Sequence, residues 1–196
     1  MKPKPGESLR FATSAALDAW LAANHGKSEG IWLEIAKKGS EHTTPNAVET
    51  LDVMLTWGWI DGQRGSKDAD FFVQRYTPRR AKSKWSKINC AKVDALTAAK
   101  KMKPAGLAQV AAAKNDGRWE KAYAGSRAIT VPPDLAKELA KRPKAKAFFE
   151  SLDSQNRYAI LYRLHMTEKP ELRAKKLEKY VTMLVENRKI YEKGER

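Results

Sequence analysis

The sequence is poor in cysteine and has no long apolar run. Cys90 is the only cysteine among 196 residues, which excludes an intramolecular disulfide and leaves a cysteine-based zinc site without partners. We expect Cys90 to be a small apolar residue on a helix rather than a nucleophile. No segment approaches the roughly 18 apolar residues of a membrane span, and the N-terminal stretch lacks the apolar run of a secretory signal. We therefore expect a chain without a transmembrane segment that stays in the cytoplasm.

Motifs of common enzyme classes are also missing. The sequence has no Gly-rich phosphate loop, no nucleophile elbow and no His-Glu-x-x-His motif. The three histidines, His25, His42 and His165, are far apart and lack metal-ligand spacing. We expect His165 to pack on a helix face beside Tyr158 and Leu161, and the other two to lie in loops. These absences predict no catalytic residue, no metal site and no cofactor.

Acidic residues are few relative to basic ones. The chain has 38 Lys and Arg against 23 Asp and Glu, a formal charge of +15, which attracts polyanions, anionic lipid surfaces or acidic small ligands. Ten basic residues and one acidic residue, Asp94, lie between residues 75 and 103. Hydrophobic residues make up an ordinary 42%, so we expect a folded globular protein.

Residue patterns predict an α+β fold that begins with an antiparallel sheet and helices. A helix should start at Thr13 or Ser14, because apolar residues follow at helical spacing. Residues 29–38 alternate as a half-buried strand does. A second helix should begin at Pro45, bury Val48, Leu51 and Leu55, and end at Gly58. Residues 59–64 and 71–77 should form two strands joined by a polar loop at residues 65–70.

The pattern becomes helical after Ser83 and stays so. We expect one helix to bury Trp85, Ile88, Ala91, Ala95, Ala98 and Met102, and the next, from Pro104, to bury Leu107, Val110 and Ala111. Residues 117–133 read as a long connection that includes a short strand at residues 128–131. Four further helices follow, separated at Pro143, at Asp153 or Ser154, and at Thr167 with Pro170. We therefore expect an α+β domain over residues 1–125 and a C-terminal helical segment over residues 126–196.

Several sequence blocks resemble a known bacterial family. The blocks are GIWLEIAKK, WGWIDGQR at residues 57–64, FFVQRYTPRR at residues 71–80, KWSK at residues 84–87, PAGL and NRYAILYRLHM. Together they resemble the YdeI/OmpD-associated, or bacteriocin-protection, family from about Phe11 to about Tyr191. The resemblance implies an α/β N-terminal part followed by a helical bacteriocin-protection-type segment. It also implies porin association, resistance to membrane-active peptides and a periplasmic location, and it supplies no catalytic residues.

The hairpin at residues 59–77 contains the candidate ligand site. Alternate side chains of a strand share a face, so Asp61 and Gln63 should lie on one face of the first strand, and Gln74 and Tyr76 on one face of the second. Tryptophans and Phe72 could wall this patch, and arginines could supply forked donors for a carboxylate or phosphate. The candidate ligand-binding residues are Trp57, Trp59, Asp61, Gln63, Arg64, Gln74, Arg75, Tyr76, Arg79, Arg80 and Trp85.

A structural interpretation of the same residues stays open. Asp61-Gly62 is also a turn or bulge signal, Trp57 and Trp59 also suit a core, and the two arginines after Pro78 also suit a solvated loop. If Asp61 is buried it needs a partner, and the nearest arginines in the hairpin are Arg64 and Arg75.

Three functions follow from these residues. The first is a non-catalytic binding or stress-protection protein for an anionic small molecule or surface. The second is a nucleic-acid-binding protein that uses the basic residues 75–103, with Trp85 and Tyr76 available for stacking. The third is an enzyme with Asp61 as general acid or base. Basic helix faces that serve only solubility are a fourth interpretation, and the exposed edge of the hairpin offers a route to a dimer.

Overall fold

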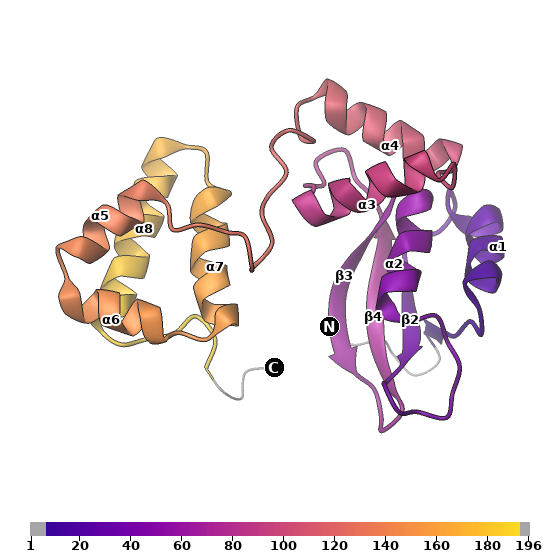
Figure 1. Ribbon diagram of the computed structural model, residues 1–196, viewed down its shortest axis with the longest axis horizontal. Coiled ribbons are helices and arrows are strands. Elements are labelled where there is room, and N and C mark those ends of the chain that lie inside the picture. The colour runs from indigo at the N-terminus through magenta and orange to yellow at the C-terminus, as the bar shows by residue number, and fades with distance from the viewer. Residues whose placement is uncertain (1–6, 193–196) are drawn as a thin grey trace. The chain divides into compact units, whose positions relative to one another are not determined.

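The computed structural model describes residues 7–192, so residues 1–6 of the N-terminal stretch considered for a secretory signal lie outside it. The chain divides into two compact units, the first ending at Ala122 and the second beginning at Tyr123. Figure 1 shows a sheet with helices in the first and helices alone in the second. The predicted fold class, α+β with an N-terminal antiparallel sheet and a C-terminal helical segment, is confirmed.

The sheet of the first unit has four strands in the order β1-β2-β4-β3. The strands are β1 (Ser8–Leu9), β2 (Ile31–Ala36), β3 (Trp59–Ser66) and β4 (Phe71–Pro78). β4 pairs antiparallel with both β2 and β3, which confirms the predicted hairpin. β1 pairs parallel with β2 and was not predicted.

Two helices cover one face of this sheet. Helix α1 (Ser14–Asn24) begins at the N-cap Thr13, whose hydroxyl accepts a hydrogen bond from the Ala16 N–H. Helix α2 (Ala47–Thr56) begins with a capping box between Asn46 and Glu49. Figure 1 shows α2 in front of the sheet with α1 beside it, and the main core lies between these helices and the sheet. This core contains Leu17, Leu21, Ile31, Leu33, Ile35, Met54, Trp59, Phe72 and Tyr76.

The predicted inner side of α2 is right for Leu51 and Leu55 and wrong for Val48. Val48 is 59% exposed, and Met54, which was not predicted to face inward, is buried beside Leu55. Gly58 follows the C-cap of α2 and has a φ of +77°, the left-handed conformation that glycine favours at the end of a helix. Strand β2 is also more buried than its alternation predicted, because Trp32 and Glu34 on its second face are buried as well.

Two further helices complete the first unit. Helix α3 (Lys87–Ala98) begins at Ser86 and helix α4 (Pro104–Asn115) begins with proline in its first turn. The predicted inner faces are right for Trp85 and Val110, which are buried, and wrong for most of the other predicted positions. α3 buries Asn89, Cys90 and Val93, and leaves Ile88 exposed; α4 buries Gly106, Val110 and Ala113, and leaves Leu107 exposed. The two helices form a second core with Leu55, Trp85 and Ala122.

The second unit consists of four helices around one core. They are α5 (Pro133–Ala140), α6 (Pro143–Ser151), α7 (Ser154–His165) and α8 (Pro170–Val185), which confirms the predicted breaks. Residues 128–131 form no strand, contrary to the prediction. His165 lies on α7, as predicted, and is exposed, with its Nε2 2.8 Å from the Thr130 carbonyl oxygen. No helix within residues 7–192 is long and apolar enough to cross a membrane.

Candidate functional site

The predicted aromatic walls of the hairpin site lie inside the protein. Trp59 and Tyr76 belong to the core between α1, α2 and the sheet, while Trp85 belongs to the second core under α3 and α4. Each of the three is 1% exposed. These side chains are therefore structural, and neither Trp85 nor Tyr76 is available for stacking on a base.

A β-bulge in β3 changes which hairpin residues share a face. Asp61 pairs with Tyr76, but the next pairing is Arg64 with Gln74, so the register shifts between them. The prediction that Asp61 and Gln63 share a face is therefore wrong, because an extra residue in a bulge reverses the alternation. Arg64 takes that face instead, with its guanidinium 3.6 Å from the Phe72 ring centroid. Gln74 is buried and its amide donates to the Gly62 carbonyl oxygen at 2.8 Å.

Asp61 does not form the predicted ion pair. It is exposed on β3, so its charge stays hydrated and needs no partner. Arg75 lies on the opposite face of the sheet, where its guanidinium is 5.9 Å from the Trp32 ring centroid. Burial raises the pKa of the Tyr76 hydroxyl, and the nearby Asp61 charge raises it further. The Tyr76 hydroxyl beside Asp61 therefore stays protonated.

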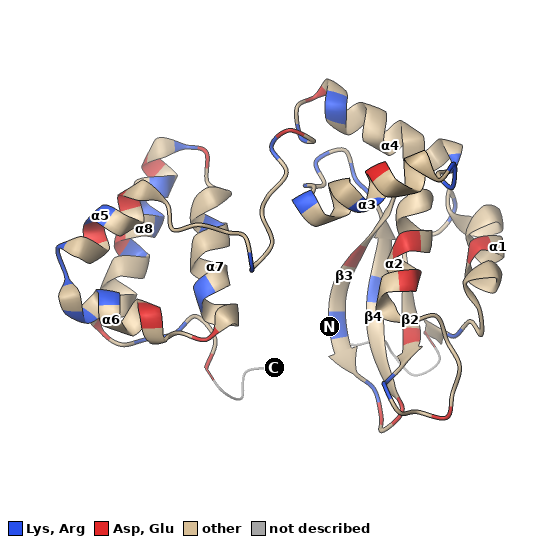
Figure 2. Cartoon of the chain, in the orientation of Figure 1, with Lys and Arg blue, Asp and Glu red and all other residues tan. Residues whose placement is uncertain are grey.

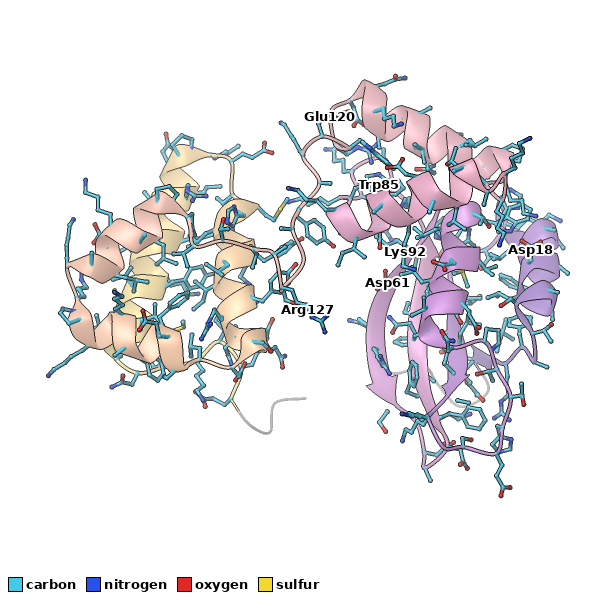
Figure 3. The ribbon with its side chains drawn as sticks, viewed as in Figure 1. Asp18, Asp61, Trp85, Lys92, Glu120 and Arg127 are labelled. Atoms are coloured by element: carbon cyan, nitrogen blue, oxygen red, sulfur yellow. The ribbon has the colours of Figure 1, made fainter. Side chains whose placement is uncertain are left out.

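Trp57 lies in a polar cluster outside the hairpin. Its Nε1 donates to Asp18 Oδ1 at 2.8 Å, and Lys103 Nζ lies 3.1 Å from Asp18 Oδ2. The His25 ring packs on Trp57 with centroids 4.6 Å apart. Lys103 fell within the basic window of the sequence, but nothing in the sequence pattern singled out Asp18. Figure 3 shows Asp18, Asp61 and Trp85 in three separate parts of the first unit.

Arg79 supports the loop that follows β4. Its side chain is 5% exposed and its guanidinium stacks 3.4 Å from the Trp85 ring centroid. Nη1 donates to the Lys84 carbonyl oxygen at 3.1 Å. Trp85 in turn packs on Trp119, with ring centroids 4.8 Å apart. Arg79, predicted as a ligand contact, therefore holds this loop against the second core.

The loop itself presents a cluster of exposed cations. We define the basic loop as residues 80–87, which contain Arg80, Lys82, Lys84 and Lys87, all exposed. None of the four forms an ion pair among the residues that the structure describes. Figure 2 shows basic residues recurring along the chain between β4 and α3. The basic loop is the strongest candidate for an anion-binding surface on the first unit.

Four hydrogen bonds fix the shape of the basic loop. The Ser83 hydroxyl accepts from the Arg80 N–H at 2.9 Å, and the Ser83 N–H donates to the Arg80 carbonyl oxygen at 2.9 Å. Arg118 Nη1 donates to the Ser83 carbonyl oxygen at 2.9 Å. The Ser86 hydroxyl caps α3 by accepting from the Asn89 N–H. The backbone is thus tied to the unit while the basic side chains remain in solvent.

The basic window of residues 75–103 does not form one continuous patch. Lys92 and Lys103 are paired with Asp52 and Asp18. Lys100 and Lys101 lie beyond the C-terminal end of α3, whereas the basic loop lies at its N-terminal end. Since α3 has 12 residues, these two groups are separated by about 18 Å along its axis.

Within residues 7–192, no three His, Cys, Asp or Glu side chains lie close enough together to hold a metal ion.

Cys90 is buried on α3, as expected, and burial raises the pKa of its thiol to about 11. Fold and surface together define a two-unit α+β protein with a fixed, exposed basic loop.

Comparison with known families assigns the two units separately. Residues 9–109 match the model described as Domain of unknown function (DUF8412), and residues 128–187 match the model described as Bacteriocin-protection, YdeI or OmpD-Associated. The chain belongs to the family of this domain of unknown function and carries a bacteriocin-protection, YdeI or OmpD-associated domain after it. No curated protein and no solved structure matched the chain.

The matches also locate the resemblance seen in the sequence. It is confirmed over residues 128–187, which include NRYAILYRLHM. Residues 57–85, with the hairpin and the start of the basic loop, fall within the other match.

Proposed function

We propose that the protein is a non-catalytic binding protein that recognises an anionic surface through the basic loop. The observation that carries this proposal is the set of four exposed cations within residues 80–87, on a backbone tied down by Arg79, Arg118 and the Ser83 hydrogen bonds. A loop that is already ordered loses little conformational entropy on binding.

The exposure of these cations favours a multivalent surface over a single small anion. An exposed ion pair contributes only about 0–1 kcal/mol, so one small ligand would be held weakly. Near an anionic lipid surface, each Lys or Arg contributes about 1 kcal/mol. The four cations of the basic loop would then contribute roughly 4 kcal/mol together, which is enough for reversible surface binding.

The family of the second unit agrees with a protective role. Its description names bacteriocin protection and association with OmpD, neither of which is a chemical reaction. A protein that associates with an anionic cell surface is consistent with that description.

Co-sedimentation with phosphatidylglycerol vesicles tests the proposal. Wild-type protein should bind them and not phosphatidylcholine vesicles, and binding should weaken steeply with salt because the contacts are exposed. Replacing Lys82, Lys84 and Lys87 with glutamine should weaken binding by about 100-fold, from about 1 kcal/mol per charge. If the triple variant binds as wild type does, the basic loop is not the site.

Nucleic acid remains the alternative polyanion. With Trp85 and Tyr76 buried, stacking on them is excluded, and the exposed cations of the basic loop would contact phosphates. Such binding would fall with salt in proportion to the number of phosphates neutralised. A gel shift with duplex and single-stranded DNA, run on the wild-type protein and on the same triple variant, tests whether the basic loop binds nucleic acid. Loop-dependent DNA binding without vesicle binding would replace the lipid surface by nucleic acid.

A further inference from the structure

A groove on the first unit lies apart from the basic loop and carries charges of both signs. It has a volume of about 770 Å³ and runs between α1, α2 and residues 100–103, the segment that joins α3 to α4. Ligand pockets commonly have volumes of about 300–1,000 Å³. The groove is therefore large enough for a short peptide.

Opposite charges line its two sides. Asp18, Glu49 and Asp52 come from α1 and α2, and Lys100, Lys101 and Lys103 come from the connecting segment. Three of these charges are already satisfied, because Lys103 and the Trp57 N–H contact Asp18 while Lys92 contacts Asp52.

Three charges are left for a ligand. Among the residues that the structure describes, Glu49, Lys100 and Lys101 form no ion pair. Glu49 Oε2 accepts the Asn46 N–H of the capping box at 2.8 Å, and this neutral donor leaves its negative charge uncompensated. The groove thus offers an anion on the α2 side and two cations on the opposite side.

Lys100 occupies a backbone conformation that a lysine rarely adopts. Its φ is 56°, in the left-handed region where glycine is favoured and other residues are strained. The surrounding hydrogen bonds hold it there: Lys100 N–H donates to the Thr97 carbonyl oxygen and Lys101 N–H to the Leu96 carbonyl oxygen. This is the usual glycine position of a helix C-terminus, so the lysine backbone there is strained compared with glycine while the hydrogen bonds close the end of α3.

The groove also has an apolar floor and a fixed side. Val53, Leu96 and Met102 line it and are half-buried in the adjoining cores. The Lys103 N–H donates to the Thr56 carbonyl oxygen at 3.0 Å, which attaches the lysine segment to the end of α2.

From this charge pattern, we infer that the groove binds a short zwitterionic peptide with apolar side chains. The ligand carboxylate pairs with Lys100 and Lys101, the ligand ammonium pairs with Glu49, and the apolar side chains cover Val53, Leu96 and Met102. This site is independent of the proposed surface binding, because the basic loop lies at the other end of α3.

Calorimetric titration with the dipeptide leucyl-leucine tests the inference. Leucyl-leucine should bind at millimolar concentration or better, while its N-acetylated and its C-amidated forms, which each lack one charge, should bind at least tenfold more weakly. No binding of leucyl-leucine, or equal binding of the acetylated form, would overturn the inference. Equal binding of the acetylated form would instead indicate a site for amphiphilic anions.

Two variants separate binding from folding. Lys100→Gly with Lys101→Gln should abolish measurable binding while the thermal midpoint stays the same or rises, since glycine relieves the strained φ. Glu49→Gln should weaken binding at least tenfold and retain the capping box, because glutamine also serves at that position. Asn187→Gly in the second unit, where φ is 53°, is the matched control and should bind as wild type does. Wild-type affinity in either groove variant would contradict the inference.

Discussion

Glu34 on β2 provides the sharpest test of the electrostatics of the first unit. Its side chain is only 7% exposed, yet it is charged, because its oxygens accept hydrogen bonds from Ser8, Arg10 and Lys67. Burial opposes ionisation, but these donors outweigh it and hold the pKa of the carboxyl at about 2 instead of 4.5. The ionised Glu34 therefore stabilises the folded state.

The size of this effect follows from the pKa. A shift from 4.5 to about 2 corresponds to about 3 kcal/mol, at about 1.4 kcal/mol for each pH unit. Arg10 and Lys67 are 44% and 36% exposed, so solvent screening reduces the contribution to about 2 kcal/mol. The contribution is complete above pH 4.5 and is lost as the pH falls towards 2, because protonation then favours the unfolded chain.

Urea unfolding followed by tryptophan fluorescence measures this contribution. All six tryptophans lie before residue 123, so the signal reports on the first unit. Glu34→Gln should lower the free energy of unfolding by about 2 kcal/mol at pH 7 and by much less near pH 2.5. Glu41→Gln, an exposed loop carboxylate, is the control and should change it by less than about 0.5 kcal/mol. A Glu34→Gln difference that is small at pH 7, or that does not shrink in acid, would refute the reasoning.

Three further predictions concern the second core, the contact between α4 and α2, and the second unit. The Cys90 thiol should react with an aromatic disulfide reagent at pH 8 at least 100-fold more slowly in the native protein than in urea, because a pKa of about 11 leaves little thiolate; similar rates would contradict its burial. Gly106→Ala should destabilise the first unit by about 2 kcal/mol in urea unfolding, since its new Cβ would lie 2.2 Å from the Thr56 carbonyl oxygen. An unchanged unfolding midpoint would show that α4 shifts away from Thr56 without cost. Arg173→Ala should lower the far-UV circular dichroism melting temperature, at a cost of about 1–2 kcal/mol, because Arg173 forms two hydrogen bonds to Asp134, at 2.6 and 3.0 Å; wild-type melting would show that this pair contributes nothing.

The sequence predicted most elements of the fold because local signals marked their ends. Thr13 and the prolines at the starts of later helices are N-terminal signals that act within a few residues. The starts predicted at Pro45 and after Ser83 lie close to the N-caps that the structure has, Asn46 and Ser86. Strand β1 lacked such a signal, since two residues carry no periodicity and the strand exists only through its pairing with β2.

The inner faces of α3 and α4 could not be derived from periodicity alone. Both helices are rich in alanine, which recurs on several faces, so packing decides which side is buried. On α4, Gly106 allows the backbone to approach Thr56, and that contact turns Leu107 outwards. On α3, the docking of Trp85 under the helix selects Cys90 and Val93 rather than Ile88.

The candidate site was the least predictable feature. Alternation placed Asp61 and Gln63 together, but the bulge separated them, and a bulge depends on pairing with β4. Arg79 and Arg80 are adjacent in sequence, yet one is buried against Trp85 and the other is exposed. The Asp18 contact with Trp57 joins residues 39 positions apart, which no local pattern indicates.

The central claim is that the exposed cations of the basic loop, and not the overall positive charge, bind an anionic surface. The most direct measurement compares two triple variants of equal net charge on phosphatidylglycerol vesicles. One replaces Lys82, Lys84 and Lys87 with glutamine, and the other replaces three exposed lysines of the second unit, Lys144, Lys175 and Lys179. We predict that the first loses about 100-fold in affinity, from about 1 kcal/mol per charge, and that the second loses less than threefold. Equal losses in both variants would contradict the claim.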